Sequence, residues 1–183
     1  MAATIEIWED TGGVVSLHGA TRAQVTNNNW KNSGAYNAAY YIQPLRRPDD
    51  DTGWTCSYTK YLYFKIYGTF TQIKNLQISI SAVPAMNTQL YGKLTNTYAE
   101  PTSALAGDLT FMGSADIPAP ALQFFPLVST TGPESATTFP IALTSGTYYT
   151  QYFKTQLRVI NSTMDDVGNT AAMQITFSFN EYE

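Results

Sequence analysis

The residues that most enzymes use as nucleophiles, bases or metal ligands are scarce in this chain. Its 183 residues include a single histidine, His18, and a single cysteine, Cys56. A serine or cysteine nucleophile needs a partner base, and a zinc site needs several nitrogen or sulfur ligands. Neither residue lies in a nucleophile elbow or a Cys-His signature. We therefore interpret His18 as a strand-end residue beside Gly19, and Cys56 as a small buried hydrophobic residue.

Carboxylates are the remaining side chains that could bind a metal ion or catalyse a reaction. Asp49 to Asp51 form one cluster and Asp165 with Asp166 another, and a glycine follows each cluster closely, as in many calcium loops. Neither cluster has the ligand spacing of an EF-hand, so solvated turns are the preferred interpretation and a structural calcium ion is the alternative. Glycoside hydrolysis would require two carboxylates to meet in space. The carboxylates available for that are Glu6, Asp108, Asp116 and Glu134.

The side chains with the clearest binding chemistry form a tyrosine stripe, defined here as Tyr61, Tyr63 and Tyr67. They alternate with apolar residues, so a strand over this segment would place the tyrosines on one face and core residues on the other. A tyrosine on an exposed strand face can stack on a sugar ring or form the centre of a protein interface. The alternative is that a sheet or loop of the same chain covers this face.

The elements that position the stripe are predicted by apolar alternation. The segment from Tyr58 to Ala82 alternates so regularly that it predicts two strands of a β-sandwich. Further strands are predicted over Gln89 to Tyr98, Thr147 to Ile160 and Met173 to Asn180, and we expect the last to be central because its core face is almost wholly aromatic or branched.

Turn signals separate these strands. Thr4 to Trp8 and Val14 to Leu17 predict a hairpin around an acidic, glycine-rich tip. The segment from Ala115 to Pro140 contains five prolines and is predicted to be a long excursion, because proline cannot occupy a central strand. Phe124 and Phe125 within it indicate that part of the excursion is buried, against this subunit or another.

The fold class that follows is all-β, a single antiparallel β-sandwich domain over residues 1–183, of jelly-roll or Greek-key type with long loops. Charged residues make up 13% of the chain, against about 25% in ordinary soluble proteins. Low charge gives little repulsion between copies, which favours constitutive association.

Composition also bears on partners and location. The net charge of −4 argues against the basic field that nucleic-acid binding requires, so we expect no nucleic acid. No apolar stretch is long enough to span a bilayer and no signal peptide is recognisable, so we expect no membrane association. The lone cysteine fits synthesis in a reducing compartment.

One part of the chain resembles a known class of protein. Residues 57–81, SYTKYLYFKIYGTFTQIKNLQISIS, resemble the strand pair of small β-sandwich structural proteins of tailed bacteriophages. In those proteins an aromatic-rich strand ends in a turn like Gly68-Thr69-Phe70, and a strand with the pattern found here at Ile73 to Leu76 follows. The resemblance implies a virion component, such as a capsid decoration (cement) protein or a tail or neck accessory, without catalytic residues.

We therefore expect a non-enzymatic virion structural protein, made in the host cytoplasm, that stabilises a shell by burying interface area between subunits. Its partner would be the major capsid protein or another virion protein, and the chain would form a homo-oligomer such as a trimer. We expect no metal and no cofactor. The alternative is a carbohydrate-binding or receptor-binding module of a phage tail or fibre, and a glycosidase ranks third. The residues predicted at the interface are Tyr61, Tyr63, Tyr67, Phe124 and Phe125.

Overall fold

The computed structural model describes residues 3–26, 30, 34, 53–82, 88–114, 123–137, 142–160 and 174–182. In these residues the chain forms two antiparallel sheets, which confirms the prediction of an all-β, sandwich-like fold. The jelly-roll or Greek-key connectivity stays a prediction. No helix in the described ranges has the length and apolar character needed to cross a bilayer. The carboxylates at 49–51, 116, 165 and 166 lie outside these ranges.

The two sheets differ in size. The larger one runs in the order β2-β1-β4-β11-β6-β7, with β10 joining β4 to β9 and with β3 on β11, and the smaller one runs β12-β5-β8. The strands are β1 (Thr4–Val15), β2 (His18–Gln24), β3 (Trp54–Cys56), β4 (Lys60–Gly68), β5 (Gln72–Ala82), β6 (Thr88–Thr95), β7 (Thr110–Ser114), β8 (Gln123–Phe124), β9 (Val128–Ser129), β10 (Gly146–Thr150), β11 (Tyr152–Ile160) and β12 (Gln174–Tyr182), with a 3-10 turn, η1 (Pro133–Ser135), between β9 and β10.

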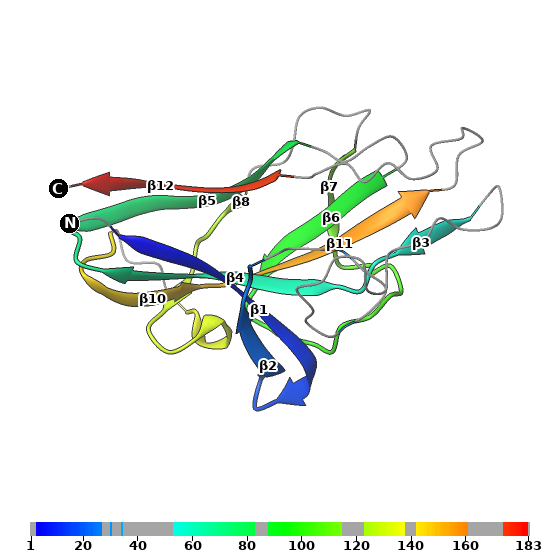
Figure 1. The fold of residues 1–183 in the computed structure, drawn as a ribbon, viewed down its shortest axis with the longest axis horizontal. Coiled ribbons are helices and arrows are strands. Elements are labelled where there is room, and N and C mark those ends of the chain that lie inside the picture. The colour runs from blue at the N-terminus through cyan, green and yellow to red at the C-terminus, as the bar shows by residue number, and fades with distance from the viewer. Residues whose placement is uncertain are drawn as a thin grey trace.

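The two sheets lie over each other at one end of the molecule. Figure 1 shows β12 and β5 above β1, β4 and β10, with the two ends of the chain close together. The backbone nitrogen of Ala3, just before β1, donates a hydrogen bond of 3.0 Å to Oε1 of Glu181 in β12. This bond links the larger sheet to the smaller one near the two ends of the chain. The β1–β2 hairpin projects away from this body.

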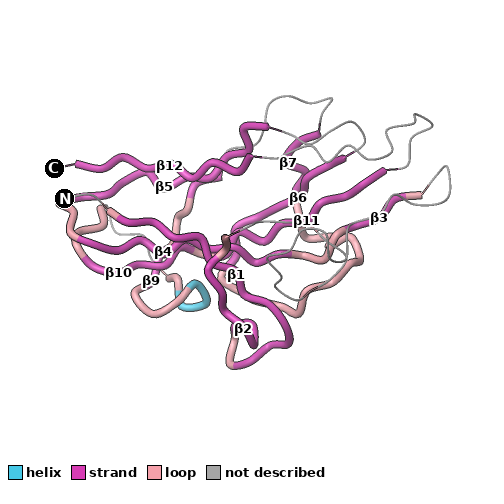
Figure 2. The backbone as a smooth tube through the Cα atoms, in the orientation of Figure 1, coloured by secondary structure: helices cyan, strands magenta, loops and turns pink. Residues whose placement is uncertain are grey.

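The predicted strands in Tyr58 to Ala82 are present as β4 and β5, but they belong to different sheets. The turn Gly68-Thr69-Phe70 carries the chain from the larger sheet to the smaller one, as the tube in Figure 2 shows. The two strands therefore face each other across the core. Fully buried apolar side chains from both meet there, and Phe64 stacks on Phe177 of β12 at 4.0 Å between ring centroids. The core residues of β4 and β5 are Leu62, Phe64, Ile66, Ile73, Leu76 and Ile78.

The alternation in β5 is interrupted by a bulge at Asn75. This residue has a φ of 56°, and the register with β12 shifts between Ser178 and Asn180, so β5 carries one extra residue there. Ile73 and Leu76 are both buried as a result, although they are three residues apart.

Three predicted elements differ in the structure. β1 is one continuous strand to Val15, because Gly12 and Gly13 form a bulge between Thr11 and Val14 and do not end the strand. Gly12 has a φ of 80° there, which a glycine adopts without strain. The segment predicted as one strand from Thr147 to Ile160 breaks at Gln151 into β10 and β11, which both pair with β4. β12, predicted to be central, is at the end of the smaller sheet as far as the described strands extend.

Gly92 in β6 lies where the core leaves no room for a side chain. A Cβ atom there would be 2.5 Å from Sδ of Met112 and 2.8 Å from Cε2 of Phe153. We expect Gly92→Ala to lower the free energy of unfolding by about 1–3 kcal/mol, because both side chains must move in a packed interior. Urea unfolding measures this change. Gly107→Ala is the matched control, since a Cβ atom at Gly107 meets no atom within 4 Å, and an equal loss in both variants would contradict the prediction.

Candidate functional site

The face of the larger sheet that turns away from the smaller sheet, called the outer face, collects the polar and aromatic side chains. Strand register places them there, because residues directly opposite each other on neighbouring strands point to the same side. Trp8 is opposite Tyr63, Asp10 is opposite both Tyr61 and Arg22, and Glu6 is opposite Lys65. Tyr149 of β10 is opposite Lys65 on its other side.

The tyrosine stripe is mostly covered by this chain itself. Tyr61 and Tyr63, both predicted at the interface, are only 1% and 2% exposed, so the alternative, that the same chain covers them, holds for these two residues. They pack in a cluster with Tyr98 and Tyr152; the Tyr98 ring lies 4.7 Å from that of Tyr61, and its hydroxyl donates to the carbonyl oxygen of Gly12 at 2.5 Å. Tyr67 is half-buried, and its hydroxyl donates to Oε1 of Glu6 at 2.9 Å.

The two phenylalanines predicted at the interface separate. Phe125 is 3% exposed and packs edge-on against Phe64 and Phe177 in the core. Phe124 is 58% exposed, because it is directly opposite Gln77 of β5 and shares with it the face of the smaller sheet that points away from the core. Phe124 and Tyr67 thus remain accessible among the five predicted interface residues, whereas Tyr61, Tyr63 and Phe125 are interior.

Beneath the outer face lies a polar network centred on Asp10, which is fully buried. Its Oδ2 accepts hydrogen bonds from the hydroxyl of Tyr152 at 2.5 Å and from the backbone nitrogen of Gly19 at 3.3 Å, and Nε of Arg22 lies 3.3 Å away. Burial raises the pKa of Asp10 above its ordinary value of 3.8, against the opposing effects of Tyr152 and Arg22. Burial and Asp10 together raise the pKa of Tyr152, which therefore stays a hydrogen-bond donor.

Arg22 connects this network to the proline-rich excursion. Its Nη2 donates to Oε2 of Glu134, in η1, at 2.7 Å. The excursion therefore helps to cover the outer face, as the alternative interpretation of the tyrosine stripe supposed. In the sequence, Arg22 and Glu134 are too far apart and too isolated for any pattern to have indicated their contact.

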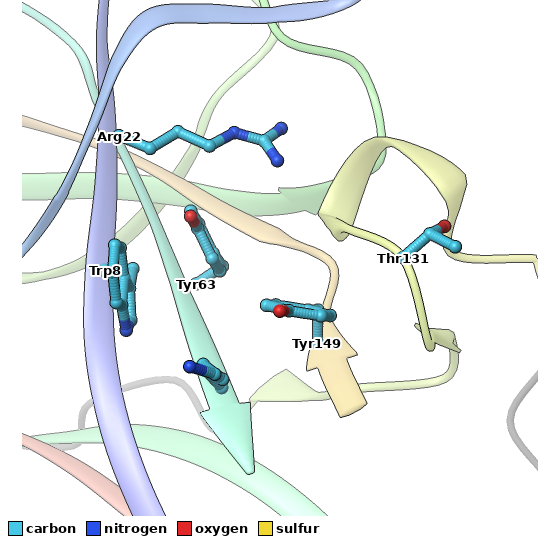
Figure 3. Close-up of a pocket in the computed structure, with 6 residues that line it drawn as sticks. Trp8, Arg22, Tyr63, Thr131 and Tyr149 are labelled. Carbon is cyan, nitrogen blue, oxygen red and sulfur yellow. The ribbon is translucent and has the colours of Figure 1, made fainter. Parts of the chain in front are cut away.

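A small pocket opens on the outer face beside this network. Its volume is about 120 Å³, and it is lined by Trp8, Arg22, Tyr63, Lys65, Thr131 and Tyr149. Figure 3 shows the rings of Trp8, Tyr63 and Tyr149 grouped together, with Arg22 reaching across from β2 and Thr131 on the far side of Tyr149, in the loop after β9. The pocket joins three aromatic rings, two cations and a hydroxyl from five segments of the chain.

The described carboxylates among those considered for glycoside hydrolysis are paired with cations; these are Glu6, Asp108 and Glu134. Lys93 and Lys154 bind Asp108 at 2.7 and 2.9 Å and lower its pKa to about 2. Hydrogen bonds from Trp8 and Tyr67 lower the pKa of Glu6. A general acid at neutral pH needs a raised pKa, so Asp108 and Glu6 are set in the opposite direction.

The two residues that invite nucleophile or metal chemistry have structural surroundings. Cys56 is 3% exposed, which confirms the interpretation as a buried hydrophobic residue, and burial raises the pKa of its thiol. His18 begins β2, as predicted, and its Nδ1 lies 2.8 Å from the carbonyl oxygen of Gly19. Within the described ranges, no three His, Cys, Asp or Glu side chains converge on a point where a metal ion would bind.

The most exposed large apolar side chain of the described chain, that of Leu17, lies where no binding site was predicted. The tip of the β1–β2 hairpin, defined here as Val14 to Leu17, exposes Val14 by 53%, Val15 by 49% and Leu17 by 70%. Ser16 and Leu17 form its turn with φ values of 47° and 78°. A two-residue turn with two positive φ angles usually carries Asn-Gly, so Ser-Leu left no recognisable signal in the sequence.

Comparison of the chain with protein-family models, with curated proteins and with solved structures found no match.

Proposed function

We propose that this protein is a non-enzymatic structural protein of a bacteriophage virion, a capsid decoration protein that adds to a shell of repeated subunits and stabilises it by burying the hairpin tip in a neighbouring protein. The observation that carries the proposal is Leu17, an apolar side chain 70% exposed on a backbone with a φ of 78°. The buried tyrosines move the proposed contact from the stripe to this tip.

Leu17 has an unfavourable backbone as well as an unfavourable exposure. A left-handed conformation costs a residue with a Cβ atom about 1–2 kcal/mol, and a branched apolar side chain in water gives nothing in return. Such strain persists where the surrounding structure imposes it, and it is concentrated at functional positions. A binding role accounts for both costs, because burial in a partner would recover the apolar surface.

The base of the hairpin is held rigidly. A hydrogen bond from Tyr98 to the carbonyl oxygen of Gly12 and the ion pair between Arg22 and Glu134 tie the two strands to the body of the protein, and a hydrogen bond from Gly19 to Asp10 joins the strands to each other. A contact element that is already ordered loses little conformational entropy on binding. This supports a role for the tip as a preformed anchor.

The surroundings of the carboxylates and the composition also support a structural role. Asp108 and Glu6 serve in ion pairs and hydrogen bonds. The low charged fraction of 13% suits a protein whose copies lie close together on a shell. Together with the resemblance of residues 57–81 to phage virion proteins, these features favour assembly over catalysis.

The double variant Ser16→Asn, Leu17→Gly separates association from folding. Asn-Gly is the preferred pair for this turn, so we expect the free energy of unfolding to stay the same or to rise. Removal of the Leu17 side chain should weaken binding by about tenfold or more, since burying a leucine contributes about 1.5–3 kcal/mol. The measurement is rebinding of purified protein to virus particles that have been stripped of it.

The matched control is Phe124→Ser, which removes from β8 an apolar residue that is also more than half exposed, and this variant should rebind like the wild type. The proposal is wrong if the turn variant rebinds with wild-type affinity, or if immunogold labelling of intact particles finds no regular array of this protein. Binding of the wild type to lipid vesicles, with the same dependence on Leu17, would likewise contradict a protein partner.

A further inference from the structure

The pocket on the outer face has no part in the proposed anchoring through the hairpin tip. The aromatic residues that line it come from β1, β4 and β10, and Thr131 comes from the loop before η1. Trp8 is half-buried although it is a large aromatic residue directly opposite Tyr63. A tryptophan, two tyrosines and charged donors around one opening provide the mixture of apolar faces and polar tips from which small-ligand sites are made.

The charges around the pocket are balanced. Arg22 donates to Glu134 at 2.7 Å, and Nζ of Lys65 lies 3.7 Å from Oε2 of Glu6. Nζ of Lys65 also lies 5.5 Å from the centre of the Trp8 ring. Each cation at the opening therefore has a carboxylate beside it, so a net anionic or cationic ligand gains little from the site as a whole.

Adjacent donors and acceptors match a ligand whose own groups both donate and accept. A hydroxyl has one donor and two acceptor positions, so neighbouring ligand hydroxyls can accept from Arg22 or Lys65 and can exchange hydrogen bonds with the hydroxyls of Tyr149 and Thr131, which line the pocket. The aromatic rings match the apolar C–H face that a sugar ring presents. These two requirements together describe a neutral, polyhydroxylated ring.

Size limits the ligand to one such ring. A volume of about 120 Å³ is well below the 300 Å³ or more of typical pockets for larger ligands, so the pocket admits no more than one ring. We propose that this pocket binds one neutral hexopyranose unit, presented as a monosaccharide or at the end of a polysaccharide, with Trp8 and Tyr149 as stacking surfaces and Lys65 as a hydroxyl-binding group.

Binding of a single ring should be weak, with a dissociation constant in the millimolar range for about a dozen non-hydrogen atoms. The probes are the methyl glycosides of glucose, galactose and mannose, measured on the whole protein by saturation-transfer NMR and by quenching of tryptophan fluorescence. We expect at least one of them to bind. Trp8→Leu should weaken that binding by about tenfold or more, because it removes a stacking surface.

Trp54→Leu is the matched control, since Trp54 is a solvent-accessible tryptophan that also lies beside a cation but is on β3, outside the pocket. Lys65→Met is the second variant, which keeps the aliphatic stem, should leave the fold intact and should weaken binding by about three- to tenfold. The proposal is overturned if none of the three glycosides binds at about 50 mM, well above the expected dissociation constant. It is also overturned if Trp54→Leu weakens binding as much as Trp8→Leu does, or if Lys65→Met has no effect on binding. Methyl glucuronide that binds about tenfold tighter than the neutral glycosides would indicate an anion site and would overturn the proposal as well.

Discussion

Replacing Lys60 with methionine is expected to lower the free energy of unfolding by about 3–5 kcal/mol. Nζ of Lys60 lies 2.9 and 3.0 Å from the two carboxylate oxygens of Glu9, and the side chains are only 7% and 5% exposed. Both residues share the core-facing side of the larger sheet with Leu62, to which Glu9 is directly opposite. Removal of the ammonium would leave the carboxylate buried without its counter-charge. Chemical denaturation at neutral pH measures the loss.

The double variant Glu9→Leu, Lys60→Met distinguishes a penalty for an unpaired charge from a general intolerance of the site. Apolar residues of similar volume often replace a buried ion pair at little or no cost, so we expect the double variant to recover most of the lost stability. A double variant that is less stable than Lys60→Met alone would contradict this account. It would mean that the site does not tolerate apolar residues, whatever their charge balance.

Asp10→Ala is the second substitution with a large expected effect. It would remove the acceptor of Tyr152 and Gly19 and the buried counter-charge of Arg22. Unsatisfied buried groups cost about 1–3 kcal/mol each, so we expect a total loss of about 3–5 kcal/mol, measured by urea unfolding. Asp10→Asn is the control, because an amide oxygen still accepts from Tyr152, and its loss should be clearly smaller. Equal losses in the two variants would show that the hydrogen bonds contribute nothing.

The same residue gives the folded chain a pH dependence of defined sign. Burial raises the pKa of Asp10 in the folded state, so the folded chain holds this proton at pH values where the unfolded chain has released it. The contribution of Asp10 to stability is therefore greatest below its ordinary value of 3.8 and falls as the pH rises from there through the raised pKa. Relative to the wild type, Asp10→Asn should become less destabilising as the pH is raised. Parallel stability profiles for the two proteins from about pH 3.5 to about pH 7 would contradict this sign.

Several elements of the fold were predictable because local pattern and final environment agree in them. In β4 the apolar residues Leu62, Phe64 and Ile66 all face the core, and in β5 the same holds for Leu76 and Ile78. Period-two alternation is a direct consequence of strand geometry, so a half-buried strand leaves its signature in any sequence that forms it. The burial of Cys56 follows in the same way from its size and apolar character.

The course of β1 was not predictable from the sequence, because its local pattern and its final environment disagree, unlike those of β4. Glu9, Asp10 and Thr11 are polar, and an acidic segment beside two glycines ordinarily predicts a solvated turn. In the structure all three are buried, because Lys60 of β4 and Tyr152 of β11 reach them from 51 and 142 residues away in the chain. Partners at that separation leave no local signal. The hairpin then turns at Ser16 and Leu17, a pair that turn statistics do not favour.

The candidate sites show the same contrast between what local patterns predict and what contacts between distant segments decide. Composition and apolar alternation are enough to predict an all-β protein with few charges, one histidine and one cysteine, in which aromatic side chains line one face of β4. Whether that face is open or covered was decided by the tertiary structure. Tyr98 and Tyr152 pack against Tyr61 and Tyr63, which are buried, while Trp8 and Tyr149 line a pocket. Alternation along a strand specifies which residues share a face, but only packing between distant segments specifies what covers that face.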